Sequence, residues 1–257
     1  MNKTAFITGA TSGIGAAYAK RLANRGYNLV LTGRRKEIIQ KLADDLSKQF
    51  NVRTKVVIAD LSDDDGIQRV VTAIKITQSL EILINNAGYA GPFILFTDQD
   101  SLTREQMTKV LVTVPMILSQ AVLPEMVKKG HGTIINVASA AAFLPNKKWA
   151  VYAASKAFLK SFSESLSLEV KNTGIKVQVV CPMPTDTDIW RGLPEEKAIM
   201  LKRYKLMSAD SVVDCSLKDL KSNHVVCVPG TRSKLLIALI TLFPRSLLYR
   251  IADKNIL

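Results

Sequence analysis

The 257-residue sequence predicts an α/β fold, a doubly wound parallel sheet of about seven strands with helices on both faces. Short runs rich in Val and Ile alternate along the chain with longer segments of helical period. Several of these runs are apolar on both faces, as in parallel strands that helices cover on each side. The composition, 47% hydrophobic and 22% charged, is that of an ordinary globular protein and excludes a disordered or collagen-like chain.

The expected strands and helices follow one another in βαβ order, which favours a parallel sheet. The expected strands cover residues 4–8, 28–32, 54–59, 82–85, 133–138, 176–181 and 225–228. The expected helices cover residues 14–24, 36–49, 64–77, 102–129 and 149–171, and two prolines at 115 and 124 interrupt the fourth. The acidic run 63–65 is interpreted as the N-terminal cap of the third helix rather than as a cation site.

A glycine-rich turn joins the first strand to the first helix. It reads Thr8-Gly9-Ala10-Thr11-Ser12-Gly13-Ile14-Gly15. Glycines let the backbone approach a pyrophosphate, whose charge then meets the free N–H groups and positive dipole end of the helix. The spacing is GxxxGxG rather than the commonest dinucleotide pattern GxGxxG, so a purely structural turn stays an alternative.

Three cations, Arg34, Arg35 and Lys36, follow the second expected strand. Proteins that select NAD usually carry an acid here, which binds the ribose 2′-hydroxyl. A guanidinium suits a 2′-phosphate instead, because it can bind the phosphate through two N–H groups. Cations at a helix N-terminus oppose the helix dipole, so an anionic ligand explains them better than a solvated helix start does. The segment predicts NADP(H) in preference to NAD(H).

Tyr152 and Lys156 are four residues apart on an expected helix, so both side chains project from the same face. A neighbouring cation favours the phenolate, so we expect Tyr152 to exchange protons near neutral pH. Ser139 comes directly after an expected strand, at the edge where open α/β sheets bind ligands. A Tyr-x-x-x-Lys pair is common by itself and gains weight from the other motifs.

With Asp60 and the run Asn85-Asn86-Ala87-Gly88, these motifs resemble the short-chain dehydrogenase/reductase family over essentially the whole chain. The LTGRR and LPEM segments and the run from Val228 are similar to its NADPH-preferring branch of DltE-like and hydroxysteroid-dehydrogenase-like proteins. The resemblance implies a single-domain Rossmann fold and an oxidoreductase that interconverts a ketone or aldehyde and an alcohol by hydride transfer.

The resemblance also implies roles for individual residues. Tyr152 is the expected general acid or base, Ser139 the hydrogen-bond partner of the substrate oxygen, and Lys156 the residue that binds the nicotinamide ribose. Arg34 is expected at the 2′-phosphate. The expected cofactor-binding residues are Gly9, Thr11, Ser12, Gly13, Ile14, Gly15, Arg34, Arg35, Asp60, Leu61, Asn86, Ala87, Gly88, Tyr152, Lys156, Pro182, Thr185 and Thr187. Substrate specificity is expected from residues 89–99, 143–148 and 187–206, and the assembly is expected to be a homodimer or homotetramer.

Two residues depart from the family pattern. Leu111 stands where the family has an asparagine that holds a proton-relay water, and leucine cannot form hydrogen bonds. Met183 replaces a glycine after the sixth strand. We expect Thr113 or solvent to serve Lys156 instead. The alternative function is a catalytically weak NADP-binding sensor or scaffold.

The last segment differs in character from residues 1–230, the expected dinucleotide-binding and catalytic domain. Residues 231–257 carry an apolar stripe rimmed by cations, which predicts a membrane-surface helix, a lid over the substrate cavity or a subunit contact.

The net charge of +13 alone does not indicate a nucleic-acid partner, since no recognition motif accompanies it. His131 and His224 lack partners at metal spacing, so no metal is expected. The three cysteines include no CxxC pair, and the apolar run at the start is too short for a signal peptide. We therefore expect a cytoplasmic protein, which the last segment could bring to a membrane.

Overall fold

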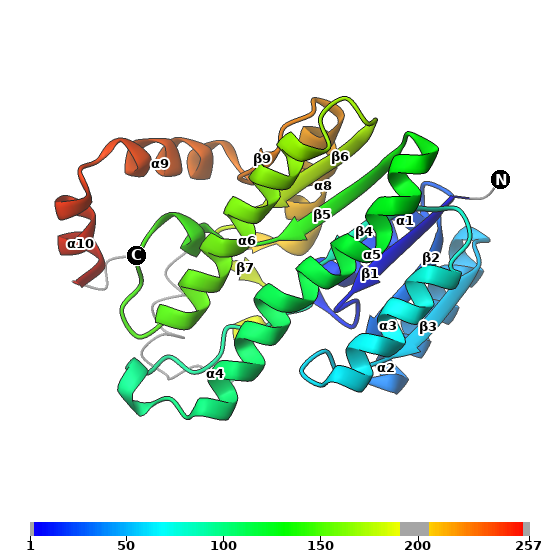
Figure 1. Cartoon of the computed structure of the whole chain (residues 1–257), viewed down its shortest axis with the longest axis horizontal. Helices are drawn as coiled ribbons and strands as arrows, with labels where there is room; N and C mark the ends of the chain where they lie inside the picture. The colour runs from blue at the N-terminus through cyan, green and yellow to red at the C-terminus, as the bar shows by residue number, and fades with distance from the viewer. Residues whose placement is uncertain (1–2, 191–205, 254–257) are drawn as a thin grey trace.

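Seven parallel strands form the central sheet of the computed structural model, which describes residues 3–190 and 206–253 (Figure 1). The strand order is β3-β2-β1-β4-β5-β6-β9. The strands are β1 (Thr4–Thr8), β2 (Asn28–Gly33), β3 (Thr54–Ile58), β4 (Leu80–Asn85), β5 (Gly132–Val137), β6 (Ile175–Val180) and β9 (Val226–Cys227). Each predicted strand is present to within two residues at either end, and the predicted fold class is confirmed.

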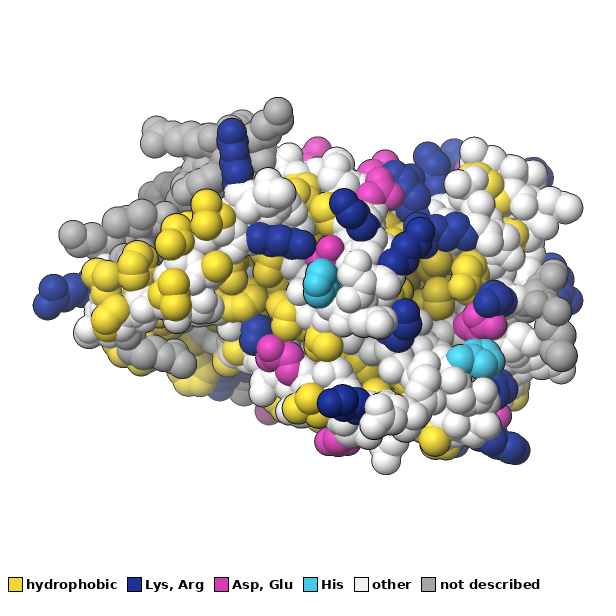
Figure 2. Space-filling model, turned by 90° about the horizontal axis from the view of Figure 1, so that it is seen from above, with side chains coloured by type: hydrophobic (Ala, Val, Ile, Leu, Met, Phe, Trp, Pro, Cys, Tyr) yellow, Lys and Arg dark blue, Asp and Glu magenta, His cyan; other side chains and the backbone are white. Residues whose placement is uncertain are grey.

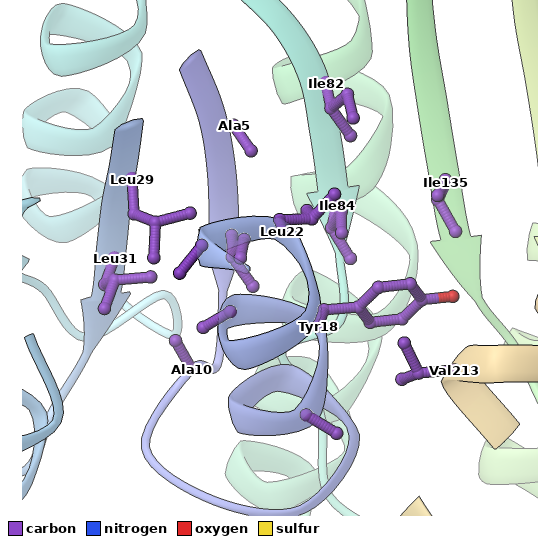
Figure 3. Close-up of a cluster of buried hydrophobic side chains, with 14 of the residues drawn as sticks. Ala5, Ala10, Tyr18, Leu22, Leu29, Leu31, Ile82, Ile84, Ile135 and Val213 are labelled. Atoms are coloured by element: carbon purple, nitrogen blue, oxygen red, sulfur yellow. The ribbon is translucent and has the colours of Figure 1, made fainter. Parts of the chain in front are cut away.

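Helices cover both faces of this sheet (Figure 1). One layer holds α1 (Gly13–Ala23), α2 (Lys36–Phe50) and α8 (Ala209–Lys221), and the other holds α3 (Asp64–Ile76), α5 (Val114–Lys129) and α6 (Ala150–Glu169). Figure 3 shows the first layer, where the Tyr18 ring of α1 lies between the sheet and Val213 of α8. Asp63 caps α3 by accepting a hydrogen bond from the Gly66 N–H, as predicted.

Helix α8 was not among the predicted elements, although its sequence carries a start signal. Ser208 is its N-cap and accepts a hydrogen bond from the Ser211 N–H. Val212, Val213 and Leu217 then bury one side of the helix against α1 and the sheet. The Tyr18 hydroxyl bonds Ser216 in the same contact, at 2.5 Å.

The helix predicted over 102–129, with interruptions at Pro115 and Pro124, is divided by a π-helical turn before Pro115, whereas α5 continues through Pro124. α4 (Ser101–Thr108) leads into the turn Lys109–Thr113, and α5 follows. Proline has no N–H, and its ring clashes with the carbonyl four residues earlier in an α-helix. The wider turn ends just before Pro115 and closes with a bond from the Val114 N–H to the Lys109 carbonyl. Leu111 therefore occupies the turn itself.

The shorter elements surround one end of the sheet. They are the 3-10 turns Phe96–Asp98, Ala140–Phe143 and Asp188–Trp190, a parallel pair of strands β7 (Thr185–Asp186) and β8 (Met207–Ser208), and the helices α9 (Thr231–Leu242) and α10 (Arg245–Asp253). Strand order reverses between β1 and β4, which lie side by side although two strands separate them in the chain. In open α/β sheets the crevice at this reversal is where ligands bind.

Candidate active site

A cavity of about 1020 Å³ lies at the carboxyl ends of the central strands. It gathers residues from the glycine turn, the loops after β2 to β6, and α9. Its lining includes every predicted catalytic and cofactor-binding residue except Gly15: Ser139, Tyr152, Lys156, Gly9, Thr11, Ser12, Gly13, Ile14, Arg34, Arg35, Asp60, Leu61, Asn86, Ala87, Gly88, Pro182, Thr185 and Thr187. The fold thus brings together residues that are far apart in the chain.

The glycine turn after β1 needs its glycines for conformation and for space. Gly9 and Gly13 have φ angles of +64° and +56°, a region that favours glycine. A Cβ on Gly9 would lie 2.7 Å from the Ala87 Cα, and one on Gly13 would lie 2.8 Å from the Thr187 Cγ2. The Asn86 side-chain amide donates to the Gly9 carbonyl at 3.0 Å and fixes the turn against the end of β4.

Gly15 does not line the cavity, and its predicted cofactor contact stays a prediction. It lies within α1, where a Cβ would lie 2.4 Å from the Gly9 carbonyl oxygen and 2.5 Å from the Asn86 Nδ2. Its missing side chain lets the helix approach the turn closely. Gly15 therefore allows the close packing of α1 against the glycine turn.

The N-terminus of α1 has the features of an anion-binding site. Its first turn carries no acid, and Ser12 at the N-cap makes no capping hydrogen bond to the helix backbone. The Ser12 and Thr11 hydroxyls instead accept hydrogen bonds from the Arg35 guanidinium, at 2.9 and 2.8 Å. Open helix N–H groups, glycines without Cβ atoms and a cation beside them fit the pyrophosphate of a dinucleotide.

The two arginines after β2 have different partners. Arg34 is exposed at the cavity rim and pairs with the Asp60 carboxylate at 3.3 Å. Arg35 turns inward and also pairs with Asp188, at 3.4 Å. Desolvation acts to raise the pKa of Asp60, but hydrogen bonds from Ser62 and from Arg34 lower that pKa below its usual value. Asp60 therefore stays ionised and holds Arg34 at the rim.

Tyr152 and Ser139 meet at the inner end of the cavity. Ser139 follows β5, and its hydroxyl accepts a hydrogen bond from the Ala141 N–H. It also lies close enough to the Tyr152 phenol to lower the pKa of that group. Tyr152 is buried on α6, and burial raises its pKa to about 12, against the lowering effect of Ser139. Desolvation is therefore the larger influence on the pKa of Tyr152 in this structure, and the expected proton exchange near neutral pH stays a prediction.

Lys156 lies one helical turn from Tyr152, with its Nζ 5.7 Å from the centre of the Tyr152 ring. The ammonium donates to the Val137 carbonyl at the end of β5, at 2.8 Å. Burial lowers the pKa of Lys156 to about 8, although the Cys181 thiol nearby acts in the opposite direction. Near neutral pH this side chain is mostly charged but close to its titration point.

Leu111 packs against Gly88, at the place where a polar side chain would face Lys156. A Cβ on Gly88 would lie 2.8 Å from the Leu111 Cδ2 and 3.8 Å from the Lys156 Nζ. Leu111 is buried in an apolar cluster with Met107, Trp149 and Tyr152. Thr113, the predicted substitute donor, is not among the cavity residues in the described part of the chain.

The remaining walls of the cavity are largely apolar. Met183, which replaces a glycine of the family pattern, lines the cavity. Leu144, Trp149 and Ile189 line it too. Each of the three predicted specificity segments contributes lining residues, while positions 191–205 of the third lie outside the described residues. Residues that sequence reasoning missed include Thr103, Gln106 and Val110, in α4 and the turn after it. Leu236, Ile237 and Ile240 of α9 belong to the last segment, for which a lid over the cavity was one of the predicted roles. The sequence of α4 gave no sign of this contact, whereas the apolar stripe of α9 did.

Comparisons with known proteins agree with this arrangement. A model of the short chain dehydrogenase family matches residues 3–198. A very-long-chain 3-oxoacyl-CoA reductase of Anas platyrhynchos is 38% identical over 182 residues, which cover 69% of this chain and 58% of that protein. The chain therefore spans less than two thirds of the length of this relative, and the same holds for its counterparts from Mus musculus and Rattus norvegicus.

Two solved structures resemble the whole chain. A short-chain dehydrogenase from Sphingobium yanoikuyae in complex with NADPH has 33% identity and a TM-score of 0.83, covering 95% of this chain and 97% of that one. A bulky-bulky ketone specific alcohol dehydrogenase from Comamonas testosteroni has 32% identity and a TM-score of 0.79, covering 95% and 96%.

Proposed function

We propose that this chain, which belongs to the short chain dehydrogenase family, is an NADPH-dependent reductase of ketones or aldehydes. The observation that carries the proposal is the position of Tyr152, with the Lys156 Nζ 5.7 Å from its ring centre, in the same cavity as Ser139 and the glycine turn. The relatives include a structure with NADPH and a ketone-specific dehydrogenase. Within the family, we assign it to the NADPH-preferring branch on the strength of Arg34, the cation at the cavity rim.

The cofactor would be held by groups that the cavity already presents. The glycine turn and the α1 N-terminus receive the pyrophosphate, with Arg35 beside it. Arg34 at the rim would receive the 2′-phosphate, and Asp60 and Leu61, which also line the cavity, would border the adenine. When bound, the nicotinamide supplies hydride to the carbonyl carbon or accepts it from the alcohol.

Tyr152 acts as the proton donor in the direction of reduction. With its pKa near 12, the phenol is fully protonated at neutral pH. As negative charge develops on the substrate oxygen, the Tyr152 and Ser139 hydroxyls donate hydrogen bonds to it, and the phenol proton passes to that oxygen. The Lys156 ammonium, 5.7 Å from the ring centre, then stabilises the phenolate that remains.

Cofactor titration and a carbonyl panel test this function. We expect tighter binding of NADPH than of NADH, and oxidation of NADPH by an apolar ketone or aldehyde. Tyr152→Phe should lower the turnover on the order of 10²–10⁴-fold and change NADPH affinity far less. Tyr27→Phe, a tyrosine outside this cavity, is the matched control. Full turnover in Tyr152→Phe would contradict the assignment.

The second candidate function is an NADP-binding sensor or scaffold with little catalysis. The buried Leu111 favours it, because an apolar side chain beside Lys156 cannot hold a water that returns a proton to the site. Tight NADPH binding without turnover on any carbonyl compound would select this function. In either case we propose a homodimer or homotetramer, which light scattering after size-exclusion chromatography measures.

A further inference from the structure

Helix α9 is apolar on nearly all sides from residue 235 onward. Its sequence there is Leu-Leu-Ile-Ala-Leu-Ile-Thr-Leu. A helix of this kind is usually either surrounded by protein or in contact with lipid. In this structure only Ile237 and Ile240 of α9 are buried, so most of its apolar surface has no protein cover.

The two sides of α9 have different surroundings. On the inner side, Leu236, Ile237 and Ile240 form part of the cavity wall. On the outer side, Leu235, Leu239 and Leu242 are 63%, 46% and 80% exposed. The exposed apolar surface continues into α10 and includes Phe243, Leu247 and Tyr249. We call these six residues the outer face.

Cations outnumber acids along the two helices that carry the outer face. Figure 2 shows hydrophobic side chains gathered over the arm that α9 forms, with Lys and Arg side chains beside them. Residues 231–253, which include both helices, contain Arg232, Lys234, Arg245 and Arg250 and one acid, Asp253. Lys234 pairs with Asp219, whereas Arg232 and Arg250 are exposed. A surface with apolar side chains and surrounding cations complements an anionic lipid layer.

We propose that the outer face of α9 and α10 docks on an anionic phospholipid surface. The helix lies in the plane of the surface rather than across it, because its 12 residues extend about 18 Å and the hydrocarbon core is about 30 Å thick. A second copy of the chain is a poorer occupant, since two such faces would bring like charges together.

The long segment Ser101–Lys129 does not provide the contact. Its length and composition would suit a membrane span, but many of its apolar side chains pack in the core, whereas Leu102 and Val127 near its ends are exposed. Val114, Leu118, Val122 and Met126 are all buried there. The outer face of α9 has no such cover.

The position of α9 also suggests how substrate arrives, and this step rests on the proposed function. The helix forms the cavity wall on one side and the docking face on the other. A carbonyl compound dissolved in the lipid layer would therefore enter past Leu236, the wall residue that is also exposed. The substrate class is then a lipid-like ketone or aldehyde.

Vesicle flotation of the full chain tests the docking surface without requiring catalysis. We expect the wild-type chain to float with phosphatidylcholine vesicles that contain phosphatidylserine. The triple variant Leu235→Gln, Leu239→Gln, Leu242→Gln should lose about tenfold or more of this binding. Replacing Arg232 and Arg250 by Gln should weaken binding about fivefold for each arginine, and only to vesicles that contain phosphatidylserine.

A matched triple variant controls for general loss of surface hydrophobicity. Ile38→Gln, Ile76→Gln, Leu168→Gln alters residues that are 45%, 62% and 72% exposed and lie outside α9 and α10, and it should float like the wild type. Circular dichroism confirms that both triple variants are folded. Equal flotation of the two triple variants would overturn the proposal. The proposal would also fail if the wild type formed an oligomer that dissociated in the outer-face variant and not in the control variant, because the face would then be a subunit contact.

Activity separates this proposal from the proposed function. The outer-face variant should reduce a water-soluble ketone at the wild-type rate and lose activity only toward a long-chain ketone supplied in vesicles. A chain that floats but reduces neither ketone would disprove the reductase function and leave the docking surface intact.

Discussion

The Lys156 ammonium donates a hydrogen bond to the carbonyl oxygen of Val137 at 2.8 Å. This bond ties α6 to the end of β5 and directs the charge toward Tyr152. The same burial that fixes the side chain makes its charge costly, so the pKa of Lys156 falls from 10.5 to about 8.

The lowered pKa of Lys156 predicts a pH-dependent stability. The unfolded chain keeps this lysine protonated up to about pH 10.5, whereas the folded chain releases the proton near pH 8. Between these values the unfolded state binds more protons, so the free energy of unfolding rises with pH. Relative to Lys156→Met, the wild type should gain on the order of 2–3 kcal/mol from pH 7 to 10.5.

Urea denaturation of both proteins across this range measures the effect. Using the difference removes the contribution of Tyr152, whose raised pKa lowers the stability of both proteins above pH 10. A difference that does not change with pH would show that the lysine titrates normally.

Leu111→Asn should raise the turnover of carbonyl reduction several-fold and leave NADPH affinity unchanged. The new amide would lie next to Gly88, near the Lys156 ammonium, where it could hold a water. It should also lower the free energy of unfolding by about 1–3 kcal/mol, because the site is apolar and buried. Leu111→Met is the control of similar volume, and an unchanged rate in Leu111→Asn would mean that no relay is needed here.

Arg34 and Arg35 should differ in cofactor selectivity. Arg34→Gln should weaken NADPH binding on the order of 10–100-fold and leave NADH binding unchanged, because Arg34 is the cation at the outer rim. Arg35→Gln should weaken both cofactors equally, because Arg35 lies at the α1 N-terminus beside the pyrophosphate that they share. Fluorescence titration measures both affinities, with Lys41→Gln on α2 as control. An equal loss of both cofactors in Arg34→Gln would remove its role at the 2′-phosphate.

Gly15→Ala should weaken both cofactors although Gly15 does not line the cavity. The added methyl would lie 2.4 Å from the Gly9 carbonyl oxygen and force α1 away from the turn. We expect a loss of about 1–3 kcal/mol in the free energy of unfolding. Gly26→Ala adds a methyl to open space at a φ of +79°, so it should lower stability without altering cofactor affinity. Normal binding in Gly15→Ala would contradict this packing role.

Much of the fold and of the site could be predicted because the signals are local. Strands such as 4–8 and 28–32 followed from short apolar runs, and the pair Tyr152 and Lys156 followed from helical spacing. Helix α8 was not predicted, because its apolar positions can be recognised as a buried face only once the α1 surface that they cover is known. The roles of the individual site residues stay predictions until the variants are measured.

By itself, the sequence determined the order of strands and helices, the glycine turn and the set of residues that could meet at one edge of the sheet. Only the tertiary structure decided that Tyr152 holds its proton, that Arg35 reaches Asp188, 153 residues away, and that α9 forms a wall of the cavity. The physical reason is that periodicity and backbone conformation depend on neighbours in the chain. Desolvation and ion pairing depend on groups that only the folded chain brings together.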